Sequence, residues 1–123
     1  MSSTADKRMI PIARPTLGDD EAEAAGRVIR SGWITQGPEV AAFEQEFADY
    51  VGAPHACAVA NCTVALHLAL LAAGVGPGDE VVTVSHSFIA TANAVRYTGA
   101  MPVFVDVEPG TYNIRLDLVT AAI

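Results

Sequence analysis

The chain has 123 residues, of which 51% are hydrophobic and 17% are charged. This composition argues against intrinsic disorder, and the length suits one domain at most. Seven basic side chains against fourteen acidic ones give a formal net charge of −7, so we expect neither nucleic acid nor a membrane as a partner. The sequence has no apolar run of membrane-spanning length and no secretory signal at its start, which predicts a cytoplasmic protein.

Two helices are predicted in the first part of the chain, after a disordered tail at residues 1–9. Acidic side chains at 19–21 favour the start of a helix because they complement the positive end of the helix dipole. Gly32 predicts the end of that helix. Pro38 is a favourable first helical residue, and it begins an amphipathic helix that Gly52 closes.

Strands and helices alternate in the rest of the chain. Predicted strands cover 55–60, 80–84 and 101–105, and predicted helices cover 64–73, 88–98 and 116–123. This alternation with short connections is typical of an α/β fold, in which a mainly parallel sheet is flanked by helices. The helix at 64–73 is apolar nearly all the way round, so we expect it to be buried on more than one side.

The turn before this apolar helix is a candidate anion site. Asn61 is a favourable helix cap, and a helix N-terminus offers free backbone N–H groups to a phosphate. Thr63 adds a hydroxyl donor, and Cys62 is small enough to let a phosphate approach the backbone. The alternative is an ordinary capped helix that binds no ligand.

The ends of the second and third predicted strands carry further candidates. Ligands of open α/β sheets lie outside the carboxyl ends of the strands, which is where His86 and Phe88 occur. The alternative is that Phe88 packs in the core and His86 is a solvated loop residue. Asp106 follows the third strand, and capping of the next turn is the favoured interpretation over ligand contact.

Neither a metal site nor a dinucleotide site is predicted. His55, His67 and His86 share no short ligand spacing, and His67 is interpreted as a hydrogen-bonded interior residue. Cys57 is expected to pack within its strand. The glycines at 74–78 close a helix, whereas a dinucleotide fingerprint follows a strand and opens a helix.

Five segments, taken together and in order, resemble the N-terminal part of the DegT/StrS family of sugar aminotransferases. They are SGWITQGP (31–38), ANCTVALH (60–67), GPGDEV (76–81), SFIATANA (87–94) and GAMPVFVD (99–106). The resemblance implies a pyridoxal-phosphate enzyme with the aspartate-aminotransferase type of fold, known as fold type I. Residues 10–123 would then be the incomplete N-terminal part of its large domain.

The resemblance also implies two groups of site residues. Those expected to bind the cofactor are Cys62 and Thr63, at its phosphate, and Phe88, stacked on its pyridine ring. Those expected to shape the substrate end of the site, next to a partner subunit, are Trp33, Thr35 and Gly37.

The implied reaction transfers an amino group from an amino acid, usually glutamate, to a keto sugar on a nucleotide carrier, in a homodimer. Such enzymes make sugars of cell-surface polysaccharides or antibiotics. The family also needs a Schiff-base lysine, but the single lysine here is Lys7, in the predicted tail. No catalytic residue is therefore assigned. We expect the chain to be the leading segment of a longer enzyme or, alternatively, a truncated and catalytically silent remnant that at most binds phosphate or a partner subunit.

Overall fold

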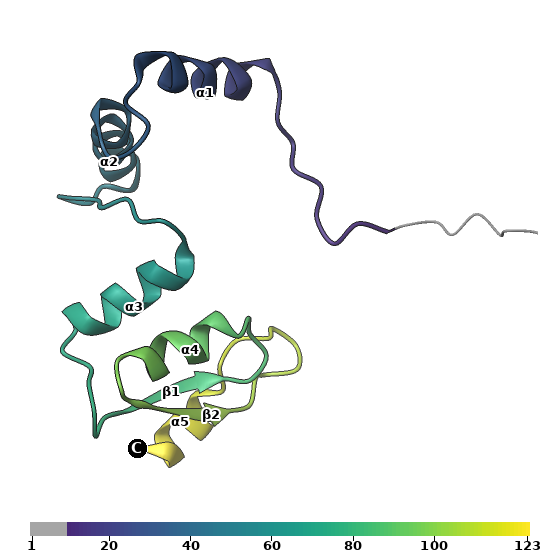
Figure 1. Ribbon diagram of the computed structural model, residues 1–123. Coiled ribbons are helices and arrows are strands. Elements are labelled where there is room, and N and C mark those ends of the chain that lie inside the picture. The colour runs from purple at the N-terminus through teal and green to yellow at the C-terminus, as the bar shows by residue number, and fades with distance from the viewer. Residues whose placement is uncertain (1–9) are drawn as a thin grey trace, which may run out of the picture. The chain divides into compact units, whose positions relative to one another are not determined.

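A computed structural model describes residues 10–123 of the chain, so the predicted disordered tail at 1–9 lies outside the described residues. The chain divides into two compact units, Met1–Cys57 and Ala58–Ile123. The described residues form five helices and a sheet of two parallel strands (Figure 1). The predicted α/β class, with a parallel sheet and helices, is confirmed.

Local signals define helix α1 (Asp19–Ser31) in the first unit. Its start is closed by the Glu21 carboxylate, which accepts a hydrogen bond of 2.7 Å from the backbone N–H of Gly18. Its end lies at Gly32, which has a φ of 73° and donates its N–H to the carbonyl of Ile29. The left-handed conformation at this position is one that glycine adopts without steric strain. Both predicted ends of the helix are confirmed.

Helix α2 (Pro38–Val51) also begins and ends where the sequence predicts. Its first residue is the proline, and Gly52 ends it with a φ of 70°. The rings of Phe43 and Phe47 lie 5.9 Å apart between centroids, and both side chains are exposed. Ala48 is the residue of this helix that is buried.

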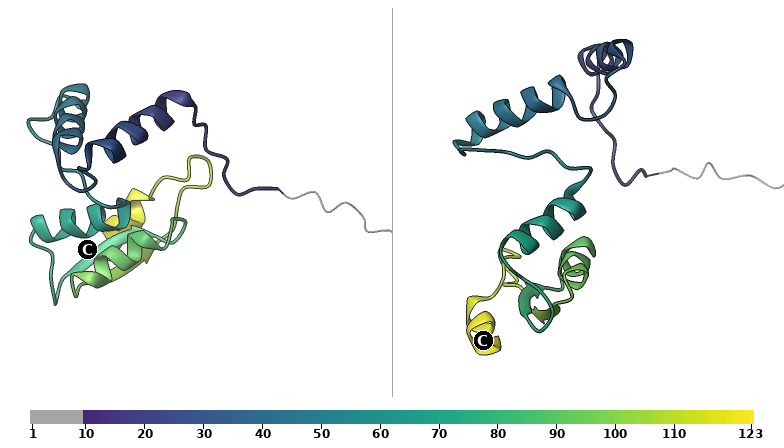
Figure 2. Two further views of the ribbon diagram at one scale, coloured as in Figure 1. Left: turned by 45° about the horizontal axis from the view of Figure 1, so that its top comes forward. Right: turned by 60° about the vertical axis from the view of Figure 1, so that its left-hand side comes forward.

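The second unit contains the sheet. Its elements in chain order are α3 (Cys62–Ala72), β1 (Glu80–Val84), α4 (Ala90–Tyr97), β2 (Met101–Val105) and α5 (Leu116–Ala122). The two strands pair in parallel from Glu80–Met101 to Val84–Val105. Helix α4 connects them and packs against both strands and against α3, whereas α5 packs against β2 (Figures 1 and 2).

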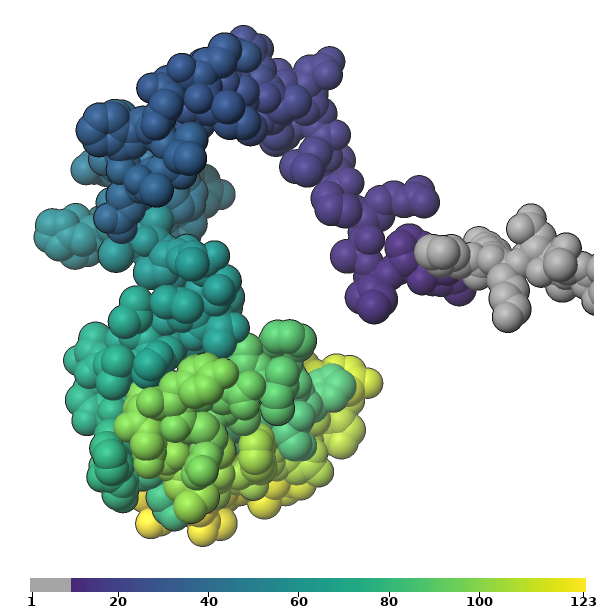
Figure 3. Space-filling model, viewed as in Figure 1, coloured from purple at the N-terminus to yellow at the C-terminus, as the bar shows by residue number. Residues whose placement is uncertain are grey.

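Small residues of α4 and of the turn after it form the core of this unit. The buried residues are Ala90, Ala94, Val95, Thr98 and Ala100. The hydroxyl of Thr98 donates to the carbonyl of Val95 at 2.8 Å, so its burial leaves no donor unpaired. At Gly99, with a φ of 87°, an added Cβ would lie 2.9 Å from Cγ of Pro77, so glycine is required there. The unit appears as a compact body in the space-filling view (Figure 3).

The predicted strand at 55–60 is wrong, because no residue of this segment is in a strand. A strand needs a hydrogen-bonded neighbour, and among the described residues β1 and β2 pair only with each other. Cys57 is exposed instead of packed inside a strand.

The expectation that the apolar helix is buried on more than one side is also wrong for the described residues. Within the unit, α4 is the element that packs against α3. Val64, Leu68 and Leu71 keep exposed fractions of 37%, 46% and 47%. His67 is half-buried and meets the ring of Tyr97 edge-on, at 5.7 Å between centroids. No helix in the described part of the chain is long and apolar enough to cross a bilayer.

Candidate functional site

Two backbone N–H groups at the N-terminus of α3 have no hydrogen-bond acceptor within the described part of the chain. The side-chain oxygen of Asn61 accepts the N–H of Val64 at 3.0 Å, and its carbonyl accepts the N–H of Ala65 at 3.1 Å. In the part of the chain that the structure describes, the N–H groups of Cys62 and Thr63 have no hydrogen-bond partner. The predicted cap is confirmed, and the two remaining donors suit an anion such as phosphate.

The charge near this helix end differs from that of α1. The first turn of α1 holds Asp19, Asp20 and Glu21, which compensate the positive end of the helix dipole. Neither α3 nor α4 has an acidic side chain in its first turn. Both helices begin on the side of the unit where β1 and β2 end (Figures 1 and 2). At this end of the sheet, two helices therefore begin without an acidic side chain in their own first turn.

Phe88 is at the same edge, just after β1. Its side chain is 77% exposed, so the alternative interpretation as a core residue is wrong. It borders a pocket of about 130 Å³, whose lining residues are Val84, Ser85, Ser87, Phe88, Ile89, Thr91, Ala92 and Phe104. An exposed ring and an unpartnered helix N-terminus at the same end of the sheet fit a planar cofactor that carries a phosphate, such as pyridoxal phosphate.

The sequence analysis missed the polar residues of this pocket. The hydroxyls of Ser87 and Thr91, four residues apart in the sequence, lie 2.9 Å from each other. The position of Ser85 and Ser87 after a predicted strand was a usable signal, because ligands gather at strand carboxyl ends. Phe104 could be placed only from the register, in which it pairs with Thr83.

His86 and Asp106 have contacts that do not require a ligand. The exposed His86 ring lies 5.3 Å from the ring of Tyr112, between centroids. Asp106 accepts the backbone N–H of Val107 at 2.8 Å through its carboxylate, as the capping interpretation predicts. Farther along the same loop, Arg115 donates to Asp117 at 3.1 Å, and this hydrogen bond lowers the pKa of the Asp117 carboxyl.

The predicted substrate-end residues belong to the loop between α1 and α2, in the first unit. The indole of Trp33 is 59% exposed, and its Nε1–H donates to the carbonyl of Gln36 at 2.5 Å. Its backbone N–H donates to the hydroxyl of Ser31 at 3.1 Å. Gly37 lies directly against the indole, and Thr35 is exposed. Cys62, Thr63 and Phe88 belong instead to the second unit.

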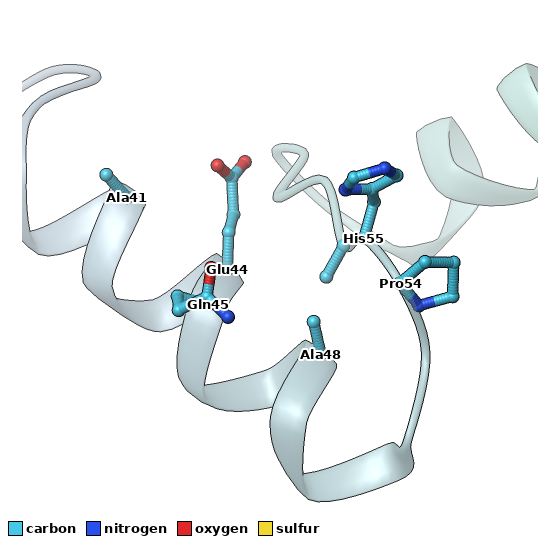
Figure 4. Close-up of a pocket in the computed structure, with 7 residues that line it drawn as sticks. Ala41, Glu44, Gln45, Ala48, Pro54 and His55 are labelled. Carbon is cyan, nitrogen blue, oxygen red and sulfur yellow. The ribbon is translucent and has the colours of Figure 1, made fainter.

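A second hollow lies in the first unit, between α2 and the segment that follows it. It measures about 170 Å³, and Glu44 and His55 are among its lining residues (Figure 4). Within residues 10–123, no three potential metal ligands gather at one place.

Comparison with known proteins identifies the family. The model of the DegT/DnrJ/EryC1/StrS aminotransferase family matches residues 15–123. The spore coat polysaccharide biosynthesis protein SpsC of Bacillus subtilis is 50% identical over 105 residues, which are 85% of this chain and 27% of that protein.

Solved structures agree with this match. A DegT/DnrJ/EryC1/StrS aminotransferase from Brucella abortus is 44% identical with a TM-score of 0.78, over 83% of this chain and 27% of that one. The putative sugar aminotransferase Spr1654 of Streptococcus pneumoniae, in its pyridoxal-phosphate form, is 34% identical with a TM-score of 0.87, over 93% and 29% of the two chains. A 3-amino-5-hydroxybenzoic acid synthase is 44% identical with a TM-score of 0.82, over 90% and 29%.

The chain thus spans between a quarter and a third of the length of these relatives. The structural likeness confirms the predicted fold class, part of an aspartate-aminotransferase-type fold. The cofactor that the family and its solved members indicate is pyridoxal phosphate. The chain belongs to the DegT/DnrJ/EryC1/StrS aminotransferase family.

Proposed function

We propose that this chain provides the cofactor-phosphate site and the ring-stacking residue of a sugar aminotransferase. The reaction moves an amino group from an amino acid, glutamate, to a keto sugar on a nucleotide carrier. The observation that carries the proposal is the pair of unpaired N–H groups at the start of α3, together with the family match over residues 15–123. The role of the relative SpsC in spore coat polysaccharide biosynthesis favours a sugar as the acceptor.

Each residue of the cofactor site has a distinct task in this proposal. The backbone N–H groups of Cys62 and Thr63, with the hydroxyl of Thr63, donate hydrogen bonds to the phosphate. The exposed ring of Phe88 stacks on the pyridine ring and holds its orientation. Bound pyridoxal phosphate supplies the electron sink for amino transfer.

The loop between α1 and α2 forms the substrate end in this proposal. Trp33, Thr35 and Gly37 border the sugar, next to a partner subunit of a homodimer. The enzyme acts in the cytoplasm, where thiols such as the unpaired Cys57 and Cys62 stay reduced.

The phosphate site is tested by Thr63→Val in the protein at its native length. Removal of the hydroxyl is expected to weaken binding of pyridoxal phosphate by about 1–3 kcal/mol, as for a hydrogen bond to a charged group. Equilibrium dialysis measures the affinity. Thr120→Val is the matched control, since the Thr120 hydroxyl donates to Leu116 of its own helix α5. Equal affinities for Thr63→Val and the unaltered protein would exclude the proposed role.

The competing function is a catalytically silent polypeptide that binds phosphate or a partner subunit. It is favoured by the single lysine of the sequence, Lys7, which precedes every described element. Borohydride reduction in the presence of pyridoxal phosphate, followed by peptide mapping, separates the two functions. For the 123-residue chain we expect no cofactor fixed to Lys7. A stoichiometric adduct on Lys7 would contradict this expectation and make that residue a candidate for catalysis.

A further inference from the structure

We propose that Gly37 is a positioning residue, whose task is to leave room for the indole of Trp33. An added Cβ at Gly37 would lie 1.9 Å from Cδ1 and 2.0 Å from Nε1 of that indole. Both distances are far below any van der Waals contact between carbon or nitrogen atoms. The indole and any side chain at position 37 therefore exclude each other.

The backbone at Gly37 gives no other reason for a glycine. Its φ of −177° and ψ of −161° are extended values that any residue adopts. Gly32, at the other end of the same loop, shows the opposite case: it has a φ of 73° and nothing within 4 Å of an added Cβ. One glycine of the loop is needed for its conformation and the other for its lack of volume.

The indole is held by one hydrogen bond of its own and lies against Gly37, while much of it faces solvent. Its Nε1–H donates to the carbonyl of Gln36, the residue just before the glycine. The backbone N–H of Trp33 donates to the hydroxyl of Ser31, which in turn donates to the carbonyl of Val28 in α1 at 2.7 Å. The Ser31 bonds fix the backbone at Trp33, and the Nε1–H bond restrains the ring, so the indole loses less rotamer freedom when a ligand binds.

Gly37 accordingly acts on the substrate end of the site through Trp33, and no side chain of its own touches a ligand. The assignment of this loop to the substrate end rests on the proposed function, whereas the placement of the indole does not. The assignment of the loop and the placement of the indole can therefore be wrong independently of each other, and each is tested by its own measurement.

The placement is tested by the fluorescence of Trp33, which is the only tryptophan of the sequence. In Gly37→Ala the indole must leave its position, and we expect its acrylamide quenching constant to rise about 1.5–2-fold, because an unrestrained exposed side chain changes rotamer rapidly. Gly110→Ala is the matched control, since an added Cβ there has open space and no left-handed backbone. An unchanged quenching constant in Gly37→Ala would overturn the proposal.

A second measurement needs no variant, so it holds even if Gly37→Ala folds poorly. The unaltered protein has one indole N–H resonance in a nitrogen–proton correlation spectrum. Its hydrogen bond to Gln36 predicts exchange with water that is about tenfold or more slower than for free indole, in the manner of protected amides. Exchange as fast as in free indole would contradict the restrained ring.

The link to the substrate is tested by a double-mutant cycle on the protein at its native length. We expect Gly37→Ala to raise KM with little change in kcat, and to have no further effect on KM when Trp33→Ala is already present. An equal rise of KM in both backgrounds would show that Gly37 does not act through Trp33. Normal kinetics in Gly37→Ala with a displaced indole would remove this loop from the substrate end and leave the cofactor site untouched.

Discussion

The helices of the two units are stabilised in different ways. In the second unit, α4 and the turn after it contribute a small buried core, at Ala90, Ala94, Val95, Thr98 and Ala100. In the first unit, Ala48 is the one residue buried among those that the structure describes. Helices α1 and α2 nevertheless begin and end at well-formed caps. Local backbone signals therefore suffice to place helix ends, whereas a core needs contacts between elements.

The apolar residues of α2 also differ from those of the second unit in how far they are buried. Phe43, Phe47 and Tyr50 keep exposed fractions of 57%, 48% and 89%, although their spacing is that of an amphipathic helix. In the second unit, by contrast, Ala94 and Val95 of α4 are 1% and 2% exposed. Hydrophobic burial is the main source of folding free energy, so we expect the second unit to be the more stable of the two.

The largest expected effect comes from filling the core of the second unit. Ala94→Leu adds a bulky side chain at a position that is 1% exposed, and overpacking of this kind costs about 1–3 kcal/mol. Urea unfolding followed by circular dichroism measures the loss. Ala42→Leu, at an exposed position of α2, is the matched control and is expected to change stability by less than about 0.5 kcal/mol. Similar losses in both variants would remove the distinction between the units.

A smaller effect is expected at the end of α2, where conformation alone matters. Gly52 has a φ of 70°, and nothing lies within 4 Å of an added Cβ. Gly52→Ala therefore introduces backbone strain without a clash, at a cost of about 1–2 kcal/mol. Amide hydrogen exchange over the last turn of α2 measures it, and we expect faster exchange there with unchanged exchange in α4. Faster exchange in α4 as well would mean that the two units unfold together.

The smallest effect is a pH dependence at the start of α1. The hydrogen bond from the Gly18 N–H lowers the pKa of the Glu21 carboxyl below its ordinary value. A lowered folded-state pKa gives stability that is present above the unfolded pKa and is lost as the pH falls through the folded one. The first turn of α1 should therefore fray under acid conditions, which the Gly18 amide chemical shift reports.

Two variants of α1 test whether the Glu21 carboxyl causes this pH dependence. Glu21→Gln is expected to remove the acid transition of the Gly18 amide, because no carboxylate remains to accept its hydrogen bond. Glu23→Gln, an exposed neighbour two residues on, is expected to retain it. An acid transition that survives in Glu21→Gln would assign it to another carboxyl group.

Helix ends were predictable from the sequence because single residues determine them. Gly32 and Gly52 adopt left-handed conformations, Pro38 needs no N–H donor at a helix start, and Asn61 supplies a side-chain acceptor. The strands at 80–84 and 101–105 were equally predictable, since both are short apolar runs. They pair with each other in the described chain.

Features that depend on distant partners were not predictable in the same way. The segment at 55–60 has the composition of a strand, but strand formation also needs a neighbour. Which sides of α3 are exposed likewise depends on the elements that pack against this helix. At the candidate site, the spacing of the sequence located Cys62 and Thr63 at a helix start, whereas their role and that of Phe88 came from the family resemblance. The contact between Trp33 and Gly37 has no signal in composition or periodicity.

The register between β1 and β2 limits how the connection between them can vary. Val84 pairs with Val105, so the two strands end side by side. The connection through α4 must therefore lead from the end of β1 back to the start of β2 over a fixed distance. A one-residue insertion or deletion that slipped β2 against β1 would exchange its two faces, so that Phe104 and Val103 would each move to the opposite side of the sheet. Natural length variation among homologous chains should therefore avoid residues 90–105 and concentrate in the loop at 107–114.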